Sequence, residues 1–124
     1  MPSTKVLLYK ENDGSVPMLE WLDSLPTKVL DKCTVRIKRL AALGHELHRP
    51  ESDFLRDGIY ELRVGLGRVN YRMLYFFHKN IAVVLSHGLV KEREVPPVEI
   101  MRAIDRKRKF EADPRGHTYE EWMI

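Results

Sequence analysis

The sequence carries three consecutive stretches that decide its fold: Gly58-Ile-Tyr-Glu-Leu-Arg63, Arg68-Val-Asn-Tyr-Arg72-Met-Leu-Tyr-Phe-Phe77, and Ile81 to Arg93. They are rich in aromatic and β-branched residues and are separated by short turns, which predicts three successive antiparallel strands. Two of these strands hold an arginine in an otherwise apolar run. Because a guanidinium inside a strand costs stability unless an anion meets it, phosphate, and hence nucleic acid, is the leading candidate ligand.

The first turn of this meander predicts which side chains share a face. If the chain turns at Gly67-Arg68, Arg63 stands directly opposite Arg72, and Glu61 lies on the same face. The other face then forms a core lining of Tyr60, Leu62, Val64, Tyr71, Met73 and Tyr75. Two interpretations of the polar face remain open: a structural Glu–Arg cluster, or a phosphate clamp of paired guanidiniums.

The remaining segments predict one strand and three helices. A short strand over 5–10 is followed by a helix over 17–25 and by a second helix that ends at Gly44. Residues 45–57 form a polar linker that Phe54 and Leu55 are expected to anchor to the core. A last helix begins at Pro96-Pro97.

This order of elements predicts an α+β fold. The N-terminal strand and the three-stranded meander form a small antiparallel sheet, with the two N-terminal helices and the C-terminal helix packed on one side of it. The other face is expected to be open and to carry the site. With 124 residues, the chain fits a single domain over 1–124 in which 114–124 form a tail.

Composition narrows the class of protein further. Net charge is +3, from 21 Lys and Arg against 18 Asp and Glu, so the chain is only mildly basic. A single cysteine, Cys33, is expected to be buried and points to a reducing compartment. The N-terminal apolar run is too brief for a signal peptide, and no run approaches the roughly 20 residues of a membrane span. A cytoplasmic protein is therefore expected.

The end of the third strand adds further candidates. Lys91 and Arg93 extend toward the arginine pair, and Gly88 is expected to permit close approach of another backbone. His87 alternates with Leu85 and Leu89, so it is expected to share a face with both, where a histidine is more often a core residue than a catalyst. No metal or cofactor is expected, since the spacing of the histidines in 45–48 does not suit a zinc helix.

Four segments together resemble the RelE/ParE toxin superfamily: Tyr60-Glu-Leu-Arg63, Tyr71-Arg-Met-Leu-Tyr75-Phe-Phe, Val84-Leu-Ser-His-Gly-Leu-Val-Lys91 and Pro97-Val-Glu-Ile-Met-Arg-Ala103. The most similar branch looks like the phage-derived HigB-type toxins, whose strands typically read "ELR", "YR…YFF" and "HGFxKK". The resemblance covers about residues 56 to 110.

The resemblance implies the toxin of a type II toxin–antitoxin system. RelE-like members cleave mRNA in the ribosomal A site, without metal, by attack of a ribose 2′-OH on the adjacent phosphate. The implied partners are the ribosome, mRNA and a cognate antitoxin of the helix-turn-helix type. The resemblance implies that operator DNA is bound only through the antitoxin complex, and it implies no membrane partner. Two alternatives remain: a ParE-like poison that binds DNA gyrase, and an inactive interaction module.

The resemblance also implies roles for particular residues. Arg72 matches the family's sheet arginine that holds the scissile phosphate, and Arg63 stands where relatives place a basic residue facing the cleft. Lys91 or Arg93 matches the basic residue after the last strand. Glu61 replaces a lysine of some relatives and is either a base or a salt-bridge partner. The further acid–base candidates are His87 and Tyr119. His117 lies with Tyr119 beyond the last helix, in the tail where relatives often have a catalytic Tyr or His.

Overall fold

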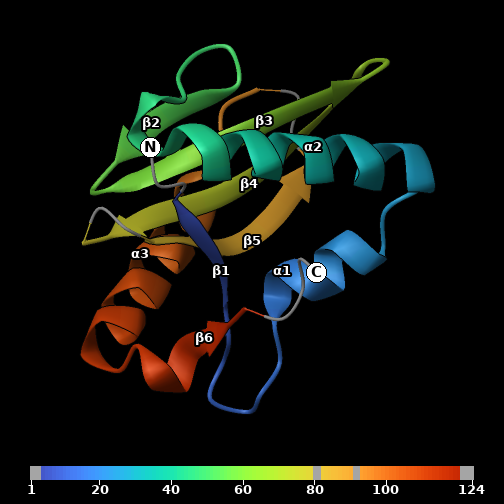
Figure 1. The fold of residues 1–124 in the computed structure, drawn as a ribbon. Helices are drawn as coiled ribbons and strands as arrows, with labels where there is room; N and C mark the ends of the chain where they lie inside the picture. Colours follow the sequence, from blue (N-terminus) through green and yellow to red (C-terminus); the bar gives the residue numbers. More distant parts are fainter. Residues whose placement is uncertain (1–3, 80–81, 91–92, 121–124) are drawn as a thin grey trace.

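The computed structural model describes residues 4–79, 82–90 and 93–120. It contains a six-stranded sheet in the order β2-β3-β4-β5-β1-β6, flanked by three α-helices (Figure 1). The elements in chain order are β1 (Lys5–Tyr9), α1 (Pro17–Asp23), α2 (Thr27–Leu43), the 3₁₀ turn η1 (Gly44–Glu46), β2 (Ser52–Arg56), β3 (Ile59–Leu66), β4 (Val69–His78), β5 (Ala82–Val90), α3 (Pro97–Ala112), the 3₁₀ turn η2 (Arg115–His117) and β6 (Thr118–Tyr119).

The predicted helices and the central hairpin are confirmed. Gly44 ends α2 with a positive φ of 54°, which a residue with a side chain rarely adopts. The turn at 67–68 places Arg63 opposite Arg72, as the period of the strands predicted. One-residue slippage would put both guanidiniums into the core beneath α2, so burial and turn geometry favour the same register.

The sheet differs from the predicted one in composition and direction. It is not wholly antiparallel, because β1 pairs in parallel with β5, and it gains β2 and β6 as its two edges. The predicted linker over 45–57 therefore contains η1 and a strand. Phe54 does not anchor it, since this side chain is 53% exposed, whereas Leu55 packs against the core beneath α3.

Helices cover both faces of the sheet, which corrects the expectation that all of them pack on one side. Side chains of α1 and α2 form one core with β-strand residues such as Leu62 and Met73. A second core joins α3 to the other face through Leu74, Phe76 and Phe110. The second face also carries Arg63 and Arg72, so its open part is limited to the region that α3 leaves uncovered.

An irregularity in β5 changes which residues share a face. Tyr75 pairs with Leu85 and Leu74 pairs with His87, so Ser86 is an extra residue in the ladder. Leu85 consequently belongs to the core beneath α1 and α2, while His87 lies beneath α3, on the opposite face. The expectation that these two side chains share a face is wrong, because strict alternation fails at a bulge.

Gly88 is approached by a side chain and not by another backbone. A Cβ atom built at Gly88 would lie 2.1 Å from Cδ2 of Trp21 on α1, so the missing side chain makes room for the indole ring. The single cysteine is fully buried, as expected. Among the described residues, no helix combines the length and apolarity needed to span a membrane.

Candidate functional site

The arginine pair is organised by a buried carboxylate. Glu61 is 1% exposed, and its two oxygens accept separate hydrogen bonds: Oε1 from Nε of Arg63 at 2.6 Å and Oε2 from Nη1 of Arg72 at 2.8 Å. Two guanidiniums directly across a hairpin would repel each other, and the carboxylate between them offsets that repulsion. The bridge also fixes the position of both donor groups, which favours recognition of a tetrahedral anion.

A second carboxylate extends this cluster toward the sheet edge. Oδ2 of Asp53 accepts a hydrogen bond from Nη2 of Arg63 at 3.2 Å and lies 3.0 Å from Nη2 of Arg49. The hydrogen bond from Arg49 is the main cause that lowers the pKa of Asp53. Three guanidiniums thus share two carboxylates, Asp53 and Glu61, so the cluster keeps one positive charge in excess.

The paired arginines border an open hollow of about 580 Å³, which Arg93 and Glu94 complete. Arg93 is exposed, the side chain of Arg63 is 37% exposed, and that of Arg72 is 13% exposed. Nε of Arg72 is buried and has no hydrogen-bond partner among the described residues. The hollow therefore combines a fixed guanidinium pair with one accessible arginine, a set of donors suited to phosphate oxygens.

The backbone of β3 is also held from α2. Nη1 of Arg36 donates a hydrogen bond to the backbone oxygen of Arg63 at 2.5 Å. A second hollow, of about 360 Å³, lies between these residues and is lined in part by Arg36, Arg63, Tyr71 and Arg72. The two hollows share both paired arginines among their lining residues.

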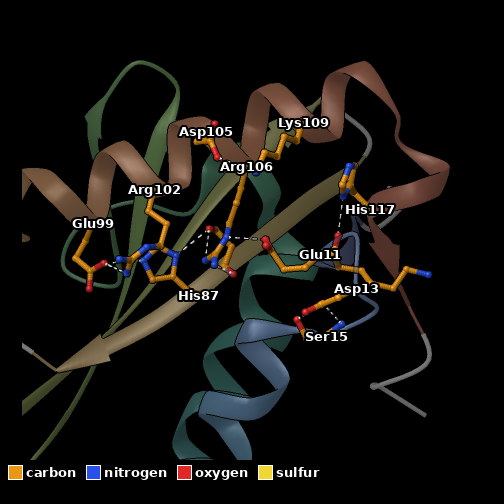
Figure 2. A network of polar contacts seen from close by, with 12 residues as sticks. Glu11, Asp13, Ser15, His87, Glu99, Arg102, Asp105, Arg106, Lys109 and His117 are labelled. Atoms are coloured by element: carbon orange, nitrogen blue, oxygen red, sulfur yellow. Dashed lines mark hydrogen bonds and ion pairs between the residues drawn. The ribbon is translucent and has the colours of Figure 1, made fainter.

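His87 is not part of this cluster. Figure 2 shows it beneath α3, where its Nδ1 lies 2.8 Å from Oγ of Ser86 and its Nε2 lies 3.4 Å from Oε1 of Glu99. Burial, followed by the charges of Arg106 and Arg102, lowers the pKa of His87 to about 3. A neutral, 6% exposed imidazole in this position fits the core interpretation rather than proton transfer at the arginine pair.

The remaining acid–base candidates lie elsewhere or outside the described residues. Tyr119 belongs to β6, at the sheet edge opposite β2, and β1 and β5 separate it from β4. His117 is stacked on Tyr9 with ring centroids 5.1 Å apart, and its Nδ1 lies 2.7 Å from the backbone oxygen of Lys10. Lys91 lies outside the described residues.

Sequence reasoning missed the contribution of β2. Asp53 pairs with Glu61 across β2 and β3, which brings its carboxylate and Arg49 beside the predicted arginines. The available signal was the position of an acidic residue in a short polar segment just before the meander. Within the part of the chain that the structure describes, no group of three or more His, Cys, Asp or Glu side chains is placed to hold a metal ion.

The strands that carry this site lie in a segment that matches a known protein family. Residues 20–109 match the family model described as Phage derived protein Gp49-like. The chain belongs to this family. The Gp49-like family is associated with RelE-like toxins, which agrees with the resemblance in the strands. The matched residues contain β2 to β5 and therefore every arginine of the cluster. No curated protein shows significant similarity to the chain.

Proposed function

We propose that this Gp49-like protein is the toxin of a type II toxin–antitoxin pair and acts as a ribosome-dependent mRNA endoribonuclease of the HigB-like branch. One observation carries the proposal: Arg63 and Arg72 are held as a pair by the buried Glu61 at an open hollow that Arg93 borders. A purely structural ion pair would not require a second guanidinium on the same carboxylate, nor an adjoining exposed cation.

The proposed reaction is attack of a ribose 2′-OH on the adjacent phosphorus. A bond forms from the 2′-oxygen to phosphorus, and the proton of the 2′-hydroxyl passes to solvent water. The bond to the 5′-oxygen of the next nucleotide breaks, this oxygen takes up a proton from water, and a 2′,3′-cyclic phosphate remains. Arg63 and Arg72 bind the non-bridging oxygens, whose negative charge increases in the transition state. Arg93, together with Lys91 from the family resemblance, supplies further positive charge near the leaving oxygen.

In the proposed reaction, proton transfer by side chains contributes less to catalysis than electrostatic stabilisation does. Both oxygens of Glu61 are occupied by guanidiniums, so its role is to orient the arginines rather than to accept a proton. His87 is enclosed beneath α3, and Tyr119 stands at the far sheet edge. Catalysis then depends mainly on electrostatic stabilisation and on alignment of the codon by the ribosome. An adjacent antitoxin of the helix-turn-helix type would neutralise the toxin, and operator DNA would be bound only by their complex.

The decisive experiment maps mRNA 5′ ends after brief induction of the wild type and of the variants Arg72→Ala and Arg93→Ala. We expect cuts within translated codons that are strongly reduced in both variants. Arg56→Ala is the matched control, because this arginine lies on β2, pairs with Asp57 at 2.6 Å and is absent from the cluster. Its cut pattern should equal that of the wild type.

Other outcomes would redirect the proposal. Growth arrest without cuts, accompanied by inhibition in a supercoiling assay, would favour the gyrase-poison alternative. Neither arrest nor cuts in several hosts would favour an inactive interaction module. An Arg72→Ala variant as toxic as the wild type would count against any role of the arginine pair in toxicity.

A further inference from the structure

The edge strand β2 exposes an aromatic ring that belongs to neither core. The ring of Phe54 is 53% exposed and meets Tyr60 edge-on, with centroids 5.2 Å apart and an interplanar angle of 67°. Tyr60 is itself stacked on Tyr75 at 5.3 Å, and the hydroxyl of Tyr75 is hydrogen-bonded to Ser52. The exposed ring of Phe54 therefore packs against ordered aromatic side chains. Its strand, β2, forms one edge of the sheet (Figure 1).

Phe54 and Tyr60 line a hollow of about 400 Å³, which we call the β2 hollow; its other walls include His45, His48 and Arg49. This volume lies within the range of sites that hold small organic groups. The ring of His45 is stacked on Phe77 with centroids 3.6 Å apart, so this wall is also ordered. Aromatic walls beside exposed arginine and histidine donors match what an unpaired nucleobase requires: a surface for stacking and partners for its polar edge.

The β2 hollow is connected to the arginine pair through Asp53. Oδ2 of this carboxylate lies 3.0 Å from Arg49, which lines the β2 hollow, and 3.2 Å from Arg63. Arg63 lines the hollow of about 580 Å³ that it shares with Arg72, Arg93 and Glu94, which we call the phosphate hollow. Successive residues of β2 point to opposite faces, so Phe54 and Asp53 lie on the two sides of one sheet edge. Arg49 thus lies beside Asp53 between Arg63 and the side of this edge on which Phe54 stands, so positive charge continues from one hollow to the other.

We propose that the β2 hollow binds the base of a nucleotide that flanks the phosphate held by Arg63 and Arg72. This inference rests on the proposed function and adds a specificity site to it. Stacking on Phe54 and Tyr60 holds the base in the plane in which Arg49 and His48 contact its polar edge and favour some bases over others, so the preference depends on the ring. The hollow sets the base preference at one position beside the cut, and the arginine pair sets the rate at all cuts.

The test compares cut-site sequences produced by Phe54→Leu, Phe54→Tyr and the wild type, again by 5′-end mapping. Leucine keeps apolar surface but removes the ring, so the base preference at one flanking position should weaken roughly tenfold. Tyrosine keeps the ring and should restore the preference. Val98→Ala is the control, because Val98 is 63% exposed on α3, away from β2. A Phe54→Leu pattern identical to the wild type, or reduced equally at every cut, overturns the inference.

A direct contact test separates this inference from the proposed function. The probe is a 2′-O-methyl pentanucleotide, which lacks the attacking hydroxyl, with 4-thiouridine at one position in turn. Crosslinks from one position to the peptide containing residues 45–60 support the β2 hollow as a base site. Crosslinks confined to residues 61–78 of β3 and β4, with normal cleavage in cells, overturn the hollow but leave the nuclease intact. Absence of both cleavage and crosslinks overturns the two proposals together.

Discussion

Arg63 and Arg72 face each other directly across β3 and β4, and their guanidiniums bind opposite oxygens of one buried carboxylate. The same three side chains therefore stabilise the sheet and form the proposed phosphate site. Substitution of either arginine is therefore expected to affect both the proposed activity and the stability of the fold.

Glu61→Gln should lower the free energy of unfolding by about 3 kcal/mol, because it leaves two partly buried guanidiniums without their common anion. Chemical denaturation in urea measures the change. Glu111→Gln is the control, since Glu111 pairs with Lys107 at the surface of α3 and should change stability by less than about 1 kcal/mol. Wild-type stability in Glu61→Gln would show that the carboxylate bridge contributes little.

Arg93→Ala should separate activity from stability. Arg93 is exposed and contributes to the phosphate hollow but not to the Glu61 bridge, so unfolding should change by no more than about 0.5 kcal/mol while mRNA cleavage falls. Arg72→Ala should reduce both quantities, because it removes one partner of the buried carboxylate. Full toxicity in Arg93→Ala would place Arg93 outside the site.

Stability should depend on the protonation of His87. Its pKa is about 3 in the fold against 6.5 without burial, so the unfolded chain binds an additional proton between these values. The stabilisation is complete above pH 6.5 and is lost as pH falls toward 3, with a limiting slope of about 1.4 kcal/mol per pH unit. Urea unfolding at pH 6.5 and pH 5 should differ by roughly 1.5 kcal/mol.

The His87→Gln variant should lose most of that difference between the two pH values. His48→Gln provides the comparison, because His48 is exposed in the loop before β2 and lies outside the core beneath α3. An unchanged slope in His87→Gln would show that other groups cause the pH dependence.

Gly88→Ala should destabilise the protein by about 2 kcal/mol, because the new methyl group would overlap the indole ring of Trp21. Displacement of the indole should also alter tryptophan fluorescence in the native state. Gly65→Ala is the matched control in the same sheet, where an added Cβ meets only Oδ1 of Asn70 at 3.9 Å. Equal stabilities of the two variants would contradict the close packing of α1 on β5.

Local patterns predicted much of the fold because they depend on neighbours in the chain. The apolar spacing in α2 and the turn at 67–68 were enough to predict a helix and a hairpin register. The parallel pairing of β1 with β5 joins segments more than 70 residues apart, and such a contact leaves no local pattern. The polar composition of β2 resembles a loop because an edge strand pairs on one side only.

The sequence by itself determined that Arg63 and Arg72 share a face with Glu61, because side chains alternate with period two on either side of a tight turn. Only the tertiary structure decided the environment of that face. Packing of α3 closed one part of it over His87, and pairing of β2 brought Asp53 and Arg49 to the remaining part. Burial and long-range strand pairing depend on the whole chain, so no single segment contains that information.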